Sequence, residues 1–184
     1  MLNKVVLTMA LALMCASSAW ALDCRSERLA ASTPTSNFIG QGEVVTDNHT
    51  SLSWMRCAVG QQWSGKTCEG EPTTLTWQEA MAIVAKVNQE GLGGYNDWRM
   101  PLVPELASIV ERQCFNPRMN TAIFPGAPSA IFWSAMEKMG SATHAYTLDF
   151  GGGAAMASIK QGAGAVRLAR GGPWWQPPAI MAKR

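Results

Sequence analysis

Residues 76–94 read TWQEAMAIVAKVNQEGLGG, and this stretch contains the start, the apolar face and the end of one helix. Thr76 followed by Glu79 is the pattern of a capping box, in which two side chains satisfy backbone N–H groups of the first turn. Apolar residues then recur at the spacing of a single helix face: Trp77, Ala80, Met81, Val84 and Ala85. Gly91, Gly93 and Gly94 end the pattern. We therefore expect an amphipathic helix that begins at Trp77.

A second helix is expected near Pro104, because proline suits the first helical position, where no N–H is needed. Glu105 then lies in the first turn, where the helix dipole favours a negative charge. Its buried face would be formed by Leu106, Ile109 and Val110. Short strand-like runs occupy Val44–Val45, Leu52–Met55, Ile131–Ser134, Ala145–Phe150, Ala154–Ile159 and Ala165–Ala169. Helices combined with many short strands predict an α+β fold.

The composition is that of one globular domain. The chain has 184 residues, of which 47% are apolar and 15% are charged. This charged fraction is too low for a chain that stays disordered in water. The formal net charge of +2 gives no field that would indicate nucleic acid as a partner.

Residues 1–21 have the pattern of a cleaved signal peptide. Lys4 supplies a positive start, the run from Val5 to Met14 is apolar, and Ala19-Trp20-Ala21 resembles a cleavage site. The apolar run is shorter than the roughly 20 residues of a transmembrane helix. We expect a periplasmic or secreted protein, released or at the cell surface, that does not span the membrane.

The remainder divides into three segments. Residues 22–39 are polar and rich in Ala, Ser and Thr, and they predict an extended N-terminal arm. Residues 40–171 form the expected domain, and residues 172–184 form a tail rich in Pro and Trp.

Four cysteines remain after signal cleavage: Cys24, Cys57, Cys68 and Cys114. An even number in an exported chain suggests disulfides, for which three pairings exist. We favour Cys57–Cys68, which closes a small loop, and hence Cys24–Cys114; free buried thiols are the alternative. A metal site is not indicated, because the chain has no C-x2-C motif and His49 and His144 lie beside no cysteine.

Motifs of catalysis are weak in this sequence, and we expect neither enzymatic activity nor a cofactor. Residues 60–67 read GQQWSGKT, the spacing of a phosphate-binding P-loop. That loop must open a helix, whereas the following residues 68–72 read CEGEP, which favours a surface turn. No G-x-S-x-G motif is present, and His144 has no carboxylate beside it.

Tryptophan is enriched, with seven of eight residues beyond the signal peptide. Most lie in predicted helices and strands and are expected in the core. Trp63, Trp174 and Trp175 lie in loop or tail sequence, where their rings could stack on sugars. Alternatively, they could cover the edge of the core or a subunit contact.

Several blocks in order resemble one known family. They are VTDNHTSLSWMRC at 45–57, Gly60-Gln61 with Trp63, Gly65, Cys68 and Gly70, Thr76-Trp77 with Glu79-Ala80, DWRMP at 97–101 with Glu105-Leu106, Phe124-Pro125, Phe132-Trp133-Ser134 and VRLAR at 166–170. Over residues 40–171 the chain resembles the Lcl C-terminal domain family, long of unknown function and named after a bacterial collagen-like adhesin. It departs from the family pattern at Ser51, where Gly is usual, at Met100, where Leu is usual, and at Leu102, where Thr commonly starts the second helix.

The resemblance implies a C-type-lectin-like fold related to the sulfatase-modifying, formylglycine-generating domains. Such a fold packs two helices on a twisted antiparallel sheet of short strands with long loops. In this fold Asp97 would cap a turn, Trp98 would fill the helix–sheet junction, and Arg99 would pair with a carboxylate inside.

The resemblance also implies a non-catalytic binding or adhesion module, with glycans or sulfated polysaccharides as the ligand class. Candidate ligand-binding residues are Asn116, Arg118, Asn120, Lys138, His144 and Trp63. Calcium dependence is not favoured, because Glu137 is the only carboxylate between Phe115 and Thr147. An envelope protein that docks a partner through residues 172–184 is the alternative function. A formylglycine-type enzyme is not favoured, because no cysteine follows Cys114.

Overall fold

The structure, a computed structural model, describes residue 24 and residues 27–172. The predicted signal peptide and the tail beyond Gly172, with Trp174 and Trp175, lie outside these residues. The described part has two α-helices, α1 (Trp77–Glu90) and α2 (Val103–Ser108), and two 3-10 turns, η1 (Thr35–Asn37) and η2 (Leu92–Gly94). Its strands are β1 (Phe38–Gln41), β2 (Val44–Asp47), β3 (Leu52–Met55), β4 (Gln62–Trp63), β5 (Cys68–Glu69), β6 (Ile131–Glu137), β7 (His144–Asp149), β8 (Ala155–Ile159) and β9 (Ala169–Gly171). The α+β class is confirmed.

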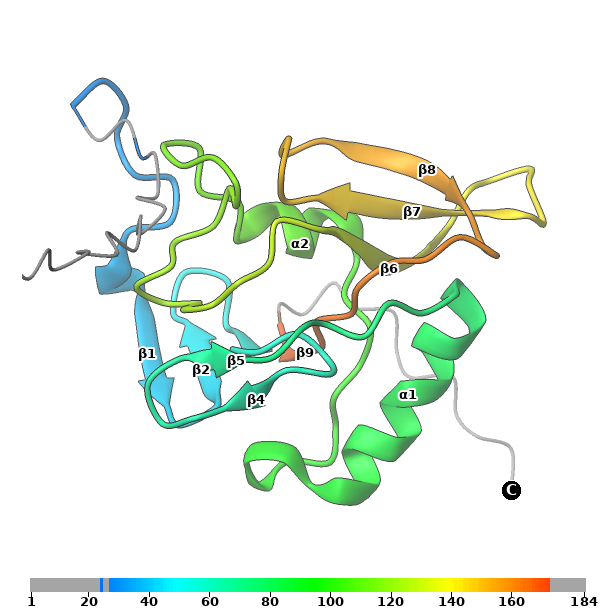
Figure 1. The fold of residues 1–184 in the computed structure, drawn as a ribbon, viewed down its shortest axis with the longest axis horizontal. Helices are drawn as coiled ribbons and strands as arrows, with labels where there is room; N and C mark the ends of the chain where they lie inside the picture. The colour runs from blue at the N-terminus through cyan, green and yellow to red at the C-terminus, as the bar shows by residue number, and fades with distance from the viewer. Residues whose placement is uncertain (1–23, 25–26, 173–184) are drawn as a thin grey trace, which may run out of the picture.

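The described strands form three small antiparallel sheets rather than one. Their orders are β1-β2-β3-β9, β4-β5 and β6-β7-β8. Figure 1 shows the three-stranded sheet at the top of the molecule and α1 at the lower right, below β6. After β8 the chain returns through the middle of the molecule to add β9 to the four-stranded sheet.

The start and end of α1 follow the predicted local signals. The Thr76 side chain accepts from the Glu79 N–H, and the Glu79 carboxylate accepts from the Thr76 N–H at 2.9 Å, so the capping box is confirmed. Gly91 ends the helix with φ of 68°, in the left-handed region that favours glycine.

The predicted buried face of α1 is partly wrong. Met81 is 40% exposed and Ala85 is also exposed, whereas Ala80 and Val87 are buried. The helix packs through Trp77, Ala80, Ile83, Val84 and Val87, which form a stripe rotated away from Met81. Apolar residues occur on more than one face of this helix, because residues 80–85 read AMAIVA. The spacing alone therefore did not show which face is buried.

Helix α2 begins one residue earlier than predicted, at Val103, so Pro104 takes the second helical position. The N-cap residue is Leu102, whose apolar side chain cannot accept a hydrogen bond from the N–H groups of the first turn. The Glu105 carboxylate still accepts from the N–H of Leu102 at 2.7 Å, which is one half of a capping box. Leu106 and Ile109 are fully buried, as predicted, although Ile109 already lies past the helix end.

Five of the six predicted strand runs lie in strands, and the run at 165–169 mostly does not. Only Ala169 belongs to β9, whereas residues 165–168 pass through the core in irregular extended form. This segment bonds to different neighbours: Ala165 to β6 on one side, and Leu168 O to the Met55 N–H on the other. All five residues are buried, so they lack the alternation of a half-exposed strand.

The block at 97–101 builds the fold. Arg99 donates to both carboxylate oxygens of buried Glu105, at 2.8 and 2.6 Å, which confirms its internal carboxylate partner. Trp98 is buried between α1 and the sheets, and the Asn88 side chain bonds both its N–H and its C=O. Asp97 pairs with Arg170 of β9 at 2.6 Å, and this hydrogen bond lowers the pKa of Asp97.

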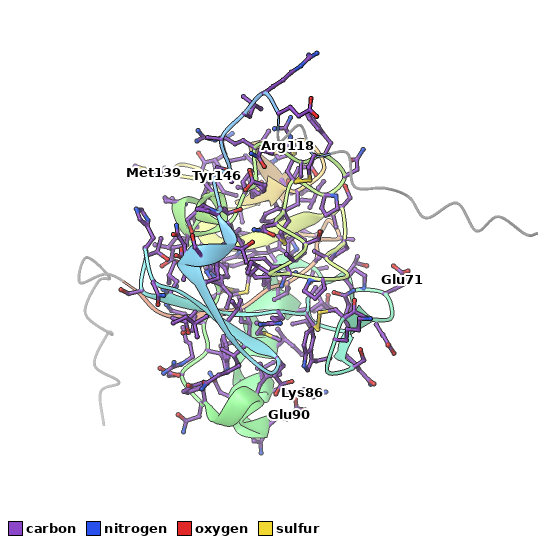
Figure 2. The ribbon with its side chains drawn as sticks, turned by 90° about the vertical axis from the view of Figure 1, so that its left-hand side faces the viewer. Glu71, Lys86, Glu90, Arg118, Met139 and Tyr146 are labelled. Carbon is purple, nitrogen blue, oxygen red and sulfur yellow. A yellow bond between two sulfur atoms is a disulfide. The ribbon has the colours of Figure 1, made fainter. Side chains whose placement is uncertain are left out.

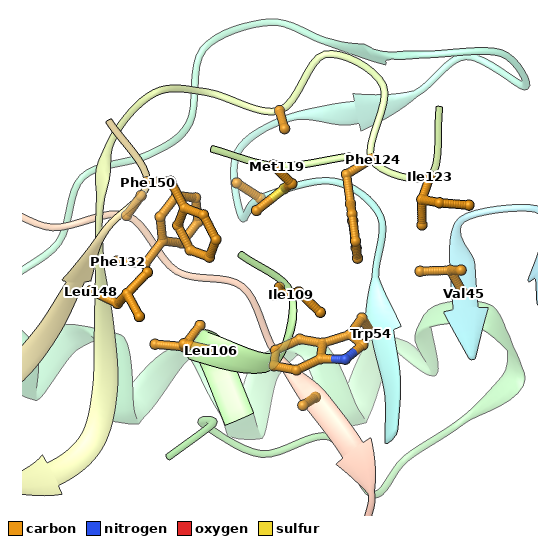
Figure 3. Close-up of a cluster of buried hydrophobic side chains, with 14 of the residues drawn as sticks. Val45, Trp54, Leu106, Ile109, Met119, Ile123, Phe124, Phe132, Leu148 and Phe150 are labelled. Carbon is orange, nitrogen blue, oxygen red and sulfur yellow. The ribbon is translucent and has the colours of Figure 1, made fainter. Parts of the chain in front are cut away.

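The main core lies between the two larger sheets and α2. Figure 3 shows Trp54, Ile109, Phe124, Phe132 and Phe150 pointing toward one another. Ser51, at the turn before β3, has φ of 60°. This is the left-handed region that favours glycine, which explains why the family pattern usually has glycine there. No described helix is long and apolar enough to cross a membrane.

Candidate functional site

Two disulfides fix the loops around the core, and both predicted pairings are confirmed. Cys57 is bonded to Cys68, and Cys24 is bonded to Cys114. The first ties the segment after β3 to β5. The second ties the start of the N-terminal arm to the loop after α2. Disulfides of this kind are compatible with an oxidising compartment.

The segment with P-loop spacing forms a β-hairpin. Gln62 and Trp63 of β4 pair with Glu69 and Cys68 of β5, and the Ser64 N–H donates to the Thr67 C=O at 3.0 Å in the turn. The next helix begins only at Trp77, so this loop does not open a helix as a phosphate-binding loop does. The predicted surface turn is confirmed.

Beside this hairpin lies a cleft of about 330 Å³, the Trp63 cleft. It is lined by Glu43, Met55, Cys57, Gln61, Gln62, Trp63 and Leu92. Gln61 is held in place, since its side chain accepts from the Ala58 N–H and donates to the Gly70 and Gly126 carbonyls. Gln62 is exposed and Trp63 is half-buried, so an amide and an indole face the solvent at this cleft.

Arg56 packs against the indole of Trp63. Its guanidinium carbon lies 4.9 Å from the ring centre, within the range of a cation–π contact. A Cβ at Gly40 would lie 1.5 Å from Arg56 Nη2, so glycine is needed there to admit the guanidinium. Burial lowers the pKa of Arg56, and its Nε has no hydrogen-bond partner among the described residues. The cation restricts the orientation of Trp63.

A second cleft, of about 410 Å³, lies between the N-terminal arm, the β2–β3 turn and the end of α2. We name it the arm cleft; its lining includes Asn37, Phe38, Asp47, His49, Thr50 and Arg112. The buried Asp47 carboxylate accepts from the His49 N–H at 2.9 Å and from the Thr50 hydroxyl at 2.7 Å. Asp47 thus shapes the turn, and exposed His49 and Arg112 lie at the rim.

Glu111 fastens the arm to the domain. Its buried carboxylate accepts from the N–H groups of Ser32, Thr33 and Gln113 and from the Thr33 hydroxyl, at 2.8–3.1 Å. Burial by itself would raise the pKa of Glu111, but the N–H groups of Gln113, Thr33 and Ser32 and the Thr33 hydroxyl outweigh it. The pKa falls from 4.5 to about 2.

The lowered pKa predicts a stability that depends on pH. The contribution of ionised Glu111 is complete above about pH 4.5 and is lost as the pH falls toward 2, because the unfolded chain binds the proton first. We expect Glu111→Gln to lower the free energy of unfolding by about 2 kcal/mol at pH 7, and by progressively less below pH 4.5. Urea unfolding at pH 7, 4.5, 3 and 2.5 measures this.

The matched control is Glu90→Gln, because the Glu90 side chain is exposed at the end of α1. It should change stability by less than about 0.5 kcal/mol at every pH. A difference between Glu111→Gln and wild type that stays constant from pH 7 to pH 2.5 would contradict the assignment.

The structure places the six predicted ligand-binding residues in separate regions. Asn116 and Arg118 lie beside the β7–β8 turn, where a Cβ at Gly151 or Gly153 would meet their side chains. Lys138 and His144 lie together at the β6–β7 turn, with the Lys138 N–H bonded to the His144 C=O. Figure 2 shows Arg118 far from Glu71, which follows the β4–β5 hairpin that carries Trp63.

Asn120 has a structural role in this arrangement. Its amide donates to the Thr33 C=O at 2.7 Å and to the Thr35 hydroxyl at 3.1 Å, and its oxygen accepts from the Ala122 N–H. His144 Nδ1 lies within hydrogen-bond distance of the Ser141 and Thr143 hydroxyls. Among the described residues no three His, Cys, Asp or Glu side chains lie together in a way that could hold a metal ion.

Sequence reasoning missed the neighbours of Trp63. Glu43 and Gln62 line the cleft from different segments of the chain, and Arg56, from a third segment, packs on the Trp63 ring. Arg56 precedes Cys57, and Gln62 precedes Trp63 inside the loop closed by the Cys57–Cys68 disulfide. This small loop was the one sequence feature that could have indicated that these residues lie close to Trp63. Glu43 could be placed only once the pairing of β2 with β3 was known.

These features define a small α+β domain of antiparallel sheets that is cross-linked by two disulfides and has clefts on its surface. The sequence model of the Lcl C-terminal domain matches residues 43–170, more than half of the 184 residues. The chain therefore belongs to the Lcl C-terminal domain family. A comparison with curated proteins finds no match.

Proposed function

We propose that this protein is an exported, non-catalytic binding module, related to C-type-lectin-like domains, that holds a glycan in the Trp63 cleft. The cleft itself is the observation that supports the proposal. Glycan sites combine a flat apolar wall with a few polar groups that orient the sugar. Trp63 supplies the wall, Gln62 supplies an amide, and Glu43 supplies a carboxylate at the edge.

The geometry favours a preformed site. The Cys57–Cys68 bond fixes the hairpin, and the Arg56 guanidinium packs on the Trp63 ring. Groups that are already ordered lose little entropy on binding. Glu43 Oε1 accepts from the Gly93 N–H at 3.0 Å, which holds this carboxylate in place as well.

The charges near the cleft favour an uncharged sugar over a sulfated one. Glu43 lines the cleft, and Glu69 lies opposite Gln62 in the β4–β5 ladder. The Glu43 carboxylate in the lining would repel a sulfate ester, and the Arg56 cation beside the cleft is engaged with the Trp63 ring. A non-catalytic role is supported because Glu43 is the one carboxylate among the described lining residues, whereas sugar hydrolysis generally uses two.

Export is supported by the two disulfides and by the signal-peptide pattern of residues 1–21. The alternative of an envelope protein that docks through its tail rests on Trp174 and Trp175, which lie outside the described residues.

We expect Trp63→Ala to weaken binding of an uncharged glycan at least tenfold, because truncation of an aromatic anchor in a pocket typically costs 2 kcal/mol or about 30-fold. A glycan array on the purified protein selects the ligand, and isothermal titration then gives the affinities. Gln62→Ala should weaken binding less, and Trp63→Phe should restore part of it.

His144→Ala is the control, because His144 belongs to another predicted region, on β7. It should bind as wild type does. An array without a single hit, or equal affinities for wild type and Trp63→Ala, would refute the Trp63 cleft as the site.

A further inference from the structure

Strand β8 forms an open edge of the three-stranded sheet. The opposite edge, β6, is covered, because Ala165 bonds to the backbone of Ile131 and Trp133 and the Ala135 N–H donates to the Pro101 C=O. No described segment pairs with the outer side of β8 (Figure 1). An uncovered edge offers backbone N–H and C=O groups to another strand.

The alternation of hydrogen bonds between β7 and β8 shows which residues of β8 direct their backbone N–H and C=O groups away from β7. The Asp149 N–H donates to the Ala154 C=O, and the Lys160 N–H donates to the Thr143 C=O. Bonding alternates along an antiparallel ladder, so Met156 and Ser158 direct their backbone groups to β7. Ala155, Ala157 and Ile159 therefore direct theirs away from the sheet, and of these the Ile159 C=O already accepts from the Gly162 N–H at 2.8 Å.

This edge has none of the features by which exposed edges usually avoid pairing. Residues 151–159 read GGGAAMASI, without charge and without proline. Met156 is 40% exposed and Ile159 is 52% exposed, so apolar side chains accompany the open backbone. Lys160, the next residue, is held by Glu137 at 2.6 Å and lies over Trp77 of α1.

We propose that β8 is an assembly edge, at which two copies of this chain pair β8 with β8 antiparallel and with Ala157 on the two-fold axis. Ala157 then faces its own copy, Ala155 faces Ile159, and Met156 faces Ser158. Ala157 exchanges two backbone hydrogen bonds with its copy, and the Ile159 N–H of each copy donates to the Ala155 C=O of the other, about four bonds in all, because the Ile159 C=O already accepts from the Gly162 N–H.

The charges fit this self-pairing. Lys160 would lie opposite Ala154, so no two like charges face each other across the axis. The result is one continuous sheet through both copies. Because a single strand edge buries less than the roughly 1,200 Å² of a stable interface, the dimer should be weak, with a dissociation constant of micromolar order or above.

The first test compares molar mass as a function of protein concentration by sedimentation equilibrium on the oxidised protein. Ala157→Lys sets two lysines against each other on the axis and leaves the bonds of Met156 and Ser158 to β7 intact. We expect wild type to dimerise and Ala157→Lys to weaken dimerisation at least tenfold. Met139→Lys, at a residue 94% exposed in the β6–β7 turn, is the charge-matched control and should dimerise as wild type does.

A second test does not depend on the charge. The Cα atoms of a hydrogen-bonded pair lie about 5.5 Å apart, within reach of a disulfide. Ala157→Cys should therefore form a covalent dimer on mild oxidation, whereas Ala155→Cys, which would face Ile159, should not. A wild type that stays monomeric at all concentrations, or equal cross-linking at both positions, would overturn the proposal.

Discussion

Replacing both Cys24 and Cys114 with serine should lower the free energy of unfolding by about 4–5 kcal/mol, close to the whole stability of many domains. The two residues are 90 positions apart, so their bond closes most of the domain into one loop. A cross-link removes conformations from the unfolded chain, and the effect grows with the length of the closed loop.

The matched comparison is the double replacement of Cys57 and Cys68. These residues are 11 positions apart, and the same relation gives about 2–3 kcal/mol. Urea unfolding at pH 7, followed by tryptophan fluorescence, measures both variants. If the shorter loop proved as costly to open as the longer one, the cost would arise in the folded hairpin and the loop-length explanation would be wrong.

Local signals in the sequence were sufficient where the structure is set by neighbours along the chain. The capping box of Thr76 and Glu79, the glycine at 91 and the run at 52–55 all appear as predicted. Glu105 in the first turn of α2 was also predictable, and so was an internal carboxylate partner for Arg99, although the sequence did not identify that partner as Glu105.

The remaining features depend on contacts between distant segments. The face that α1 buries is set by Trp98 and Trp133, and nothing within residues 77–90 reveals their positions. Residues 165–168 have the composition of a strand, yet they lie between two sheets and pair regularly with neither. The Trp63 cleft likewise joins Glu43, Met55 and Leu92, which only the sheet pairing and the η2 turn bring together.

Arg167 shows most clearly what the sequence could not reveal, because a fully buried arginine lies in the core. Its guanidinium carbon lies 4.9 Å from the ring centre of Phe124 and 5.7 Å from that of Phe132. Nη1 donates to the carbonyls of Met55, at 2.7 Å, and of Arg56, whereas Nε and Nη2 have no partner among the described residues. Burial lowers the pKa of Arg167 to about 9, so the side chain remains protonated at neutral pH.

Arg167→Ala should lower the free energy of unfolding by about 4–5 kcal/mol. The substitution leaves a cavity between the two rings and removes the donor to two buried carbonyls. Arg167→Met fills a similar volume without bringing a charge into the core, and replacement of a buried charge by an apolar side chain of similar size is often nearly neutral. The methionine variant should lose only about 1–2 kcal/mol, for the two carbonyls.

Urea unfolding of the alanine, methionine and lysine variants at pH 7 distinguishes the effect of side-chain volume from that of charge. If Arg167 acts mainly by filling the core and bonding the Met55 and Arg56 carbonyls, Arg167→Met should be much more stable than Arg167→Ala. Arg167→Lys keeps the positive charge, but the lysine side chain is shorter and its ammonium is a compact, strongly hydrated charge that cannot stack on the rings as the planar guanidinium does. This variant should therefore be less stable than Arg167→Met. A methionine variant as unstable as the alanine variant, with a lysine variant near wild type, would show instead that the cation between the aromatic rings is what this core requires.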